Sequence, residues 1–132
     1  MAGTLVANTI NTDTGLFSTN NAYSGIAKAY VFFTNNGSTL TTYQSFNVSS
    51  ITRVTTGVID INLSTAMSSN AYPCFYNTNA GGSTTLGTAP TYNDRIGTAT
   101  PTSTTQFRVI SGQQSSSNTY DNFWNSAGIL GT

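Results

Sequence analysis

The chain has 132 residues, a formal net charge of zero, one cysteine and no histidine. This length predicts one domain, since a compact domain typically holds about 100–200 residues. The missing histidine excludes a Ser-His-Asp triad and imidazole metal ligands, and the single Cys74 excludes an internal disulfide and a zinc cluster.

Neutral polar residues dominate the composition, because Thr, Ser and Asn make up 56 of the 132 positions. Threonine favours strands and asparagine favours turns, so the composition is typical of an all-β protein with polar loops. Four scattered cations do not form a phosphate-binding surface, and we expect no nucleic-acid partner. The apolar runs are far shorter than the roughly 20 residues that span a bilayer, so we expect no membrane insertion.

The first part of the chain predicts an N-terminal arm of about residues 1–25, with a short strand over residues 4–10 and loop over residues 11–25. Residues 26–33 are the strongest strand candidate. Both of their alternating faces are largely apolar, which predicts a central strand covered on both sides. Asn35-Asn36-Gly37 predicts a tight turn, and a polar strand is expected over residues 39–43.

The middle of the chain predicts a hairpin whose strands cover residues 45–52 and 58–63, joined by residues 53–57. In the first strand we expect Phe46 and Val48 on one face. In the second strand the alternation predicts the inward positions Ile59, Ile61 and Leu63 and the outward positions Asp60 and Asn62.

The next strand is expected over residues 71–77, at a sheet edge or starting after Pro73, because proline has no ladder donor. Residues 77–104 are rich in Gly, Thr and Ser and predict a long loop with one short strand near Tyr92.

The C-terminal part predicts a strand over residues 105–110, where Phe107 and Val109 alternate with Arg108. The apolar tail from Tyr120 to Leu130 is expected to pack on its own domain or on a neighbour, as a last strand. We therefore predict a single antiparallel β-sandwich over residues 1–132, jelly-roll-like or Ig-like, with about seven or eight short strands.

Catalytic chemistry finds little support in these residues. The four carboxylates, Asp13, Asp60, Asp94 and Asp121, lie in contexts typical of turns, caps and solvated strand positions. Cys74 has no histidine base to activate it, and no Asp-x-Asp-x-Asp spacing predicts a calcium loop. We expect neither enzymatic activity nor a cofactor or metal.

Three tyrosines outside the strongest strands, Tyr23, Tyr92 and Tyr120, are candidates for glycan or partner contact. Tyrosine rings can stack on sugars while nearby Asn and Gln amides bond the hydroxyls. The competing interpretation is packing beneath loops or contact between subunits.

Several segments resemble a β module found in virion proteins of tailed bacteriophages, especially marine and cyanophage-like ones. The resemblance starts from Gly25-Ile-Ala-Lys-Ala-Tyr-Val-Phe-Phe33. It continues through residues 45–52, residues 57–67 and the Phe-Arg-Val of residues 105–109, and the opening residues 3–10 are similar to the starts of phage fibre proteins.

The resemblance implies a homotrimeric virion component, assembled in the host cytoplasm, with the major capsid protein among its partners. The short, shaftless chain favours a head decoration or cement protein that reinforces the capsid. The glycine-rich loop favours the alternative, a tail-fibre or receptor-binding module that contacts host glycans. A polysaccharide-degrading tail enzyme is the third, least favoured class. Expected assembly contacts are Leu5, Val6, Ile10, Phe123, Trp124, Ile129 and Leu130.

Overall fold

The computed structural model describes residues 9–12, 15–18, 26–78, 95–113 and 118–131. Within these residues the chain forms ten β-strands and no helix. The strands are β1 (Thr9–Thr12), β2 (Gly15–Ser18), β3 (Ala27–Asn35), β4 (Leu40–Phe46), β5 (Val48–Thr55), β6 (Val58–Leu63), β7 (Cys74–Thr78), β8 (Arg95–Ser103), β9 (Gln106–Gln113) and β10 (Trp124–Leu130).

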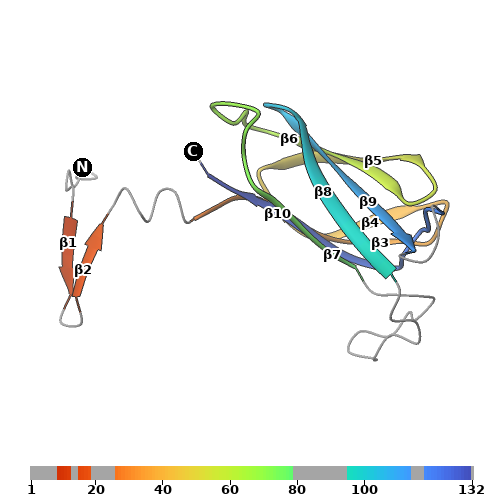
Figure 1. Ribbon diagram of the computed structural model, residues 1–132, viewed down its shortest axis with the longest axis horizontal. Coiled ribbons are helices and arrows are strands. Elements are labelled where there is room, and N and C mark those ends of the chain that lie inside the picture. Colours follow the sequence, from red (N-terminus) through yellow and green to blue (C-terminus); the bar gives the residue numbers. More distant parts are fainter. Residues whose placement is uncertain (1–8, 13–14, 19–25, 79–94, 114–117, 132) are drawn as a thin grey trace.

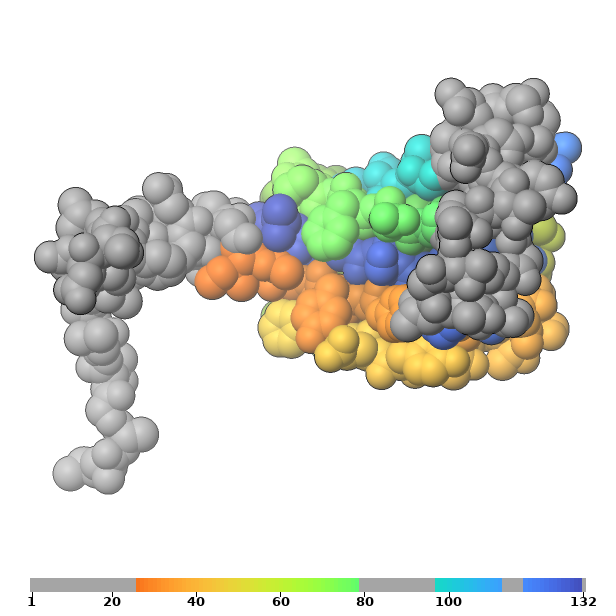
Figure 2. Space-filling view, turned by 90° about the horizontal axis from the view of Figure 1, so that it is seen from below, coloured from red at the N-terminus to blue at the C-terminus, as the bar shows by residue number. Residues whose placement is uncertain are grey.

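Eight of these strands form two four-stranded sheets that pack face to face (Figure 1). We call the sheet with the strand order β4-β3-β10-β7 the front sheet, because its outer face is turned toward the viewer in Figure 2, and the sheet with the order β5-β6-β9-β8 the back sheet. All neighbouring strands in both sheets are antiparallel. The predicted all-β fold, an antiparallel β-sandwich of seven or eight short strands, is confirmed.

Alternating apolar side chains from both sheets fill the space between them. In β6 the inward residues Ile59, Ile61 and Leu63 are buried, while Asp60 and Asn62 are half-buried on the opposite face, as predicted. Burial of one large apolar side chain contributes about 1.5–3 kcal/mol, so this layer is the main source of stability. The core consists of Ala29, Val31, Phe33, Ile59, Ile61, Leu63, Met67, Tyr72, Phe107, Val109, Ala127 and Ile129.

Strand β3 is central, as predicted, but the prediction that it is covered on both sides is wrong. Its inner residues Val31 and Phe33 are fully buried, whereas Tyr30 on the outer face is 38% exposed and Phe32 is half-buried. A two-layer sandwich buries one face of each sheet, and the other face meets solvent. The apolar outer residues of β3 therefore lie at the surface.

The predicted continuous strand over residues 45–52 is also wrong, because the chain changes sheet at Asn47. Phe46 ends β4 in the front sheet and Val48 begins β5 in the back sheet. Asn47 has a φ of 53°, in the left-handed region that asparagine enters more readily than most residues with a side chain. Phe46 is consequently exposed, and Val48 packs against the core, so the two do not share a face.

Two segments that predict loops contain strands. Within residues 11–25, β2 pairs with β1, and within residues 77–104, β8 pairs with β9. β8 includes Gly97 and Pro101, which are unfavourable inside a sheet. β8 is an edge strand, however, so Pro101 needs no second ladder partner. The remainder of the predicted long loop, residues 79–94, lies outside the described residues.

The remaining predicted elements agree with the structure. β7 begins directly after Pro73 and lies at a sheet edge. The C-terminal tail forms the last strand, β10, which is inserted between β3 and β7. The turn after β3 contains Gly37 with a φ of 90°, and the polar strand that follows is β4. Of the predicted first strand, residues 4–8 lie outside the described residues, and Thr9 and Ile10 belong to β1.

A hydrogen-bond network around Asp121 joins the two sheets. Its carboxylate accepts bonds from Nη2 of Arg53 in β5 (2.6 Å), from Nδ2 of Asn35 at the end of β3 (2.8 Å) and from the backbone N–H of Gly57 (2.9 Å). Burial opposes ionisation of this carboxyl. The hydrogen bonds from Arg53, Gly57 and Asn35 and the charge of Arg53 outweigh the burial, so the pKa of Asp121 lies below its usual value.

The network predicts a specific loss of stability in acid. A carboxyl with a lowered folded-state pKa stabilises the fold above its unfolded pKa of about 3.9, and this contribution is lost as the pH falls through the folded pKa. We expect the free energy of unfolding, measured with urea, to fall below about pH 4. Asp121→Asn should be less stable at pH 7 and lose less stability in acid. Asp60→Asn, which leaves the network intact, is the control, and identical pH profiles for Asp121→Asn and wild type would contradict the prediction.

Candidate functional site

The exposed aromatic side chains gather on the outer face of the front sheet. Tyr30, Tyr43, Phe46 and Phe75 are each between 38% and 58% exposed, and all four come from front-sheet strands. Figure 2 shows this face, with β7 in green, β10 in blue, β3 in orange and β4 in yellow-orange as adjacent bands. We call the following residues the aromatic face: Tyr30, Phe32, Tyr43, Phe46, Phe75 and Trp124.

One row of the aromatic face crosses all four strands in register. Phe75 in β7 lies opposite Gly128 in β10, Gly128 lies opposite Tyr30 in β3, and Tyr30 lies opposite Phe46 in β4. A Cβ atom at Gly128 would lie 2.7 Å from Cε2 of Phe75, so the Phe75 ring lies against the backbone of β10. The rings of Tyr30 and Phe46 have centroids 6.0 Å apart. The glycine thus leaves room for the Phe75 ring over β10, and we call the row of Phe75, Tyr30 and Phe46 the aromatic strip.

A second group of rings lies beside this strip. Phe32 and Trp124 are stacked with centroids 5.3 Å apart and planes 6° apart. The ring centroid of Tyr43 lies 5.8 Å from that of Phe32 and 5.6 Å from that of Trp124. The register between β3 and β4 shifts at Phe32, which leaves Tyr43 as an extra, bulged residue, and a bulge re-aims its side chain. Each aromatic pair contributes about 0.5–1.5 kcal/mol beyond its buried area, so these rings hold one another in place.

Neutral polar side chains alternate with the rings. Asn77, Ser126 and Gln44 are exposed and lie in the cross-strand row of Phe32. Their amides and hydroxyl can both donate and accept hydrogen bonds. Lys28 is the only charged residue in the four front-sheet strands. This surface therefore offers ring faces and neutral hydrogen-bonding groups with little charge.

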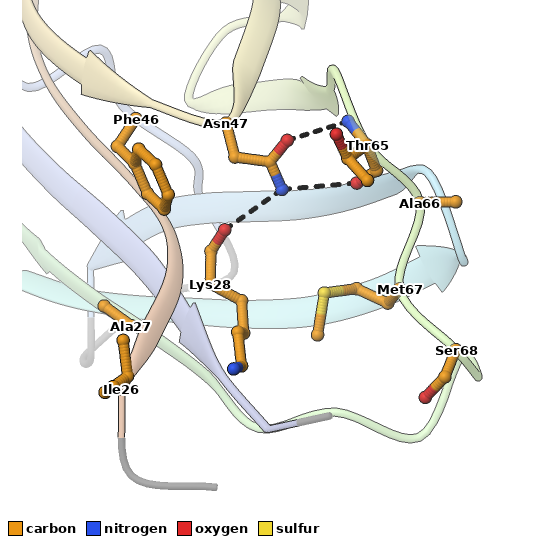
Figure 3. Close-up of a pocket in the computed structure, with 9 residues that line it drawn as sticks. All are labelled: Ile26, Ala27, Lys28, Phe46, Asn47, Thr65, Ala66, Met67 and Ser68. Atoms are coloured by element: carbon orange, nitrogen blue, oxygen red, sulfur yellow. Dashed lines mark hydrogen bonds between the residues drawn. The ribbon is translucent and has the colours of Figure 1, made fainter. Parts of the chain in front are cut away.

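A groove of about 580 Å³ adjoins the aromatic face at Phe46 (Figure 3). Its lining includes Lys28, Asn47, Thr65 and Met67. The Asn47 side chain donates to the carbonyl oxygens of Lys28 (3.0 Å) and Thr65 (3.2 Å) and accepts from the Thr65 N–H (2.7 Å). Asn47 therefore joins the start of β3, the crossing between the sheets and the segment after β6.

The described carboxylates are both engaged by arginine. Arg108 donates to Asp60 through Nε (2.6 Å) and Nη2 (2.9 Å), and Arg53 holds Asp121. Asp13 and Asp94 lie outside the described residues. Burial raises the pKa of Cys74 to about 11, so this thiol is neutral at pH 7. Within the part of the chain that the structure describes, no cluster of His, Cys, Asp or Glu could hold a metal ion.

Of the three tyrosines predicted to contact a glycan or partner, only Tyr120 lies within the described residues. Tyr23 and Tyr92 lie outside the described residues. Tyr120 is half-buried, its backbone N–H donates to the Ser111 carbonyl, and Nδ2 of Asn118 donates to its hydroxyl at 3.5 Å. Tyr120 thus lies outside the strands of the front sheet, and its backbone is bonded to Ser111 of β9 in the back sheet.

The predicted assembly contacts separate into different environments. Leu5 and Val6 lie outside the described residues, and Ile10 lies in β1. Ile129 is fully buried in the core of its own chain, because it is an inward position of β10, so it is not available to a partner. Phe123, Trp124 and Leu130 are half-buried, and the ring of Phe123 meets that of Trp124 edge-on, with centroids 5.2 Å apart.

Reasoning from the sequence missed the aromatic face as a site. Its rings come from residues 30–46, from Phe75 and from Trp124, and only pairing of distant strands brings them together. The available signal was the alternation of Tyr30 and Phe32 on one face of the strongest strand. That signal predicts an apolar face, but it does not say whether another layer covers it.

Comparison with known proteins finds no matching family model, curated protein or solved structure. Among the described residues there is no helix that could cross a membrane. The function must therefore be inferred from the residues and their geometry.

The role of Asn47 can be tested with two substitutions. Asn47→Gly keeps access to the left-handed backbone but removes three hydrogen bonds, and we expect it to lower the free energy of unfolding by about 1–3 kcal/mol. Asn47→Ala removes the same bonds and adds a backbone penalty of roughly 1 kcal/mol, so it should be the less stable variant. Urea denaturation measures both values. Equal stability of the two variants would contradict a role for the left-handed backbone at this position.

Proposed function

We propose that the chain is a non-catalytic structural protein of a tailed-phage virion. Of the possible locations on the particle we favour the head, where the chain would be a decoration protein. In this role it binds where capsid subunits meet and reinforces the shell. The sequence resemblance supports the proposal, and two of its segments lie in sandwich strands: residues 25–33 cover most of β3, and residues 105–109 overlap the start of β9.

The observation that carries the proposal is the N-terminal hairpin. β1 and β2 pair from Thr9↔Ser18 to Thr12↔Gly15 and form a two-stranded sheet separate from both sheets of the sandwich (Figure 1). An isolated two-stranded hairpin is marginally stable in water and needs further packing. A neighbouring virion protein would supply that packing, so we assign particle attachment to the N-terminal arm, residues 1–25, which includes Leu5, Val6 and Ile10.

The polar chemistry of the chain suits long persistence in salty water. Contacts between exposed charges weaken as salt screens them, whereas neutral hydrogen bonds and apolar contacts depend little on salt. The described residues contain two Arg–Asp ion pairs, and most of their other side-chain hydrogen bonds come from Ser, Thr, Asn, Gln and Tyr. A decoration protein built in this way would keep its contacts at high ionic strength.

The copy number per particle tests the placement. Quantitative mass spectrometry of purified particles should give about one chain per major capsid subunit, or one trimer per three subunits, for a head decoration protein. A ratio of a few per cent would place the chain in the tail and overturn the head placement. Absence of the chain from the particle would overturn the virion role.

The arm can be tested by breaking its hairpin without removing it. Phe17 lies opposite Ile10 in β2, and Phe17→Pro removes a backbone donor from that ladder. We expect Phe17→Pro to leave the thermal unfolding of the sandwich unchanged and to reduce recovery of the protein on particles several-fold. Phe17→Leu, which keeps the donor, is the matched control. Full recovery of Phe17→Pro on particles would show that attachment does not use the hairpin.

The proposed homotrimer has its own test. Size-exclusion chromatography with light scattering should give three times the chain mass of 13.9 kDa at micromolar concentration. A stable monomer under these conditions would contradict the trimer.

A second candidate, a tail-fibre or receptor-binding module that contacts host glycans, is favoured by the neutral polar side chains between the rings of the aromatic face. Gln44, Asn77 and Ser126 are exposed there, and amides and hydroxyls are the groups that bond sugar hydroxyls.

A further inference from the structure

We propose that the aromatic face is a platform for an extended, neutral, β-linked glycan. The glycan would lie across the strands of the front sheet, along the row Phe75, Gly128, Tyr30 and Phe46. This site differs from the loop tyrosines that the sequence predicts. The inference rests on the proposed virion role only for the source of the glycan, a host surface.

The orientation and exposure of the rings make them available for stacking with a ligand. The Phe75 ring lies against the β10 backbone above Gly128, yet Phe75 remains 47% exposed, so its free side faces solvent. Tyr30 and Phe46 are 38% and 53% exposed, and their planes are only 30° apart. Three exposed rings therefore lie along one row of a sheet. Exposed aromatic rings can stack on the apolar faces of a ligand.

The length of the row indicates the size of the ligand. Phe75 and Phe46 lie on the two edge strands of the front sheet, three strand spacings apart. At about 4.8 Å per spacing, the row is about 14 Å long, which accommodates an oligosaccharide better than a single sugar. Equatorially substituted, β-linked sugars present flat patches of axial C–H groups on alternate sides and form extended ribbons. Such a ribbon can present an apolar patch to each exposed ring of the row.

The residues beside the rings indicate a neutral, hydroxyl-rich ligand. Gln44, Asn77 and Ser126 form the adjacent cross-strand row and can donate to or accept from sugar hydroxyls. Lys28, at one end of β3, is the only charge in the four strands, so the face has no cluster of cations for an acidic polysaccharide.

The composition disfavours a protein as the occupant. Protein interfaces are enriched in methionine and arginine together with aromatic residues. The four front-sheet strands contain no methionine and no arginine, and their outward rings alternate with amides and a hydroxyl. The aromatic face thus has the aromatic residues that are typical of a protein interface but lacks the methionine and arginine that accompany them there.

Tryptophan fluorescence provides an intrinsic probe of ligand binding to the aromatic face. Trp124 is the single tryptophan, and it stacks on Phe32 within the aromatic face. Titration of the full chain with cellohexaose, a neutral β-1,4-linked glucose hexamer, should change the tryptophan emission in a saturable way, with Kd in the millimolar range or tighter. Isothermal titration calorimetry should give the same Kd. Maltohexaose, whose α-1,4 linkages curve the chain, should bind more weakly.

Matched variants locate the site. Tyr30→Ala and Phe75→Ala should each weaken binding about five- to tenfold, which corresponds to the loss of one ring contact. Tyr30→Phe and Phe75→Tyr keep the rings and should bind like wild type, which separates loss of the ring from misfolding. Val54→Ala alters an exposed apolar residue of the back sheet and should leave binding unchanged.

Three outcomes would overturn the proposal. The first is no saturable signal with cellohexaose or with the corresponding β-1,4-linked mannose and xylose hexamers. The second is undiminished binding in both alanine variants or equal weakening in Val54→Ala. The third is no glycan binding together with a change in oligomeric mass or particle recovery in the alanine variants, which would make the face a protein interface.

Failure of this proposal can be distinguished from failure of the virion role. Phe17→Pro, which tests attachment to particles, leaves the aromatic face intact and should bind cellohexaose like wild type. If the protein is recovered on particles but does not bind glycan, only the proposed glycan platform is refuted. If it binds glycan but is absent from particles, only the proposed virion role is refuted.

Discussion

Packing of the two inner sheet faces against each other is the interaction on which the rest of the structure depends. Successive residues of a strand point to opposite faces, so burial of Val31 and Phe33 in β3 forces Tyr30 and Phe32 outward. The same constraint in β10 buries Ile129 and turns Gly128 outward. The aromatic face therefore results from the choice of residues that are buried in the core and from the strand order β4-β3-β10-β7.

Neutral and charged hydrogen bonds hold this sandwich together at opposite ends of β3. At its start, the Asn47 side chain bonds the Lys28 carbonyl and the segment after β6, where the chain passes between the sheets. At its end, Asn35 and Arg53 meet at Asp121. In both places, side-chain hydrogen bonds near a turn connect a residue of β3 to a segment outside the front sheet. Each set of bonds therefore holds one sheet in position relative to the other. These bonds thereby link the sheet that carries the outer rings to the rest of the sandwich at both ends of β3.

The proposed functions use different parts of the chain. The N-terminal hairpin is a two-stranded sheet separate from the sandwich, and such a hairpin is marginally stable unless something packs on it, as the proposed attachment to a particle would. The aromatic face belongs to a stable four-stranded sheet whose rings are already in place, which lowers the ordering cost of binding. A module attached through its arm would leave the face available to a ligand. The two described aspartates, Asp60 and Asp121, are each paired with an arginine.

The sequence by itself determined the all-β class, the inward positions of β6 and β9 and the turn at Gly37, and it limited β7 to a sheet edge or to a start after Pro73, because strand alternation and the backbone limits of glycine and proline are local properties. It did not determine β8, whose Gly97 and Pro101 are tolerated only because the strand lies at an edge. It also did not reveal the break at Asn47, since residues on both sides favour strands. Tertiary structure alone decided that Phe75, Tyr30 and Phe46 lie in one exposed row, because that row depends on pairing between strands distant in the chain and because no strand among the described residues packs on the outer face of the front sheet.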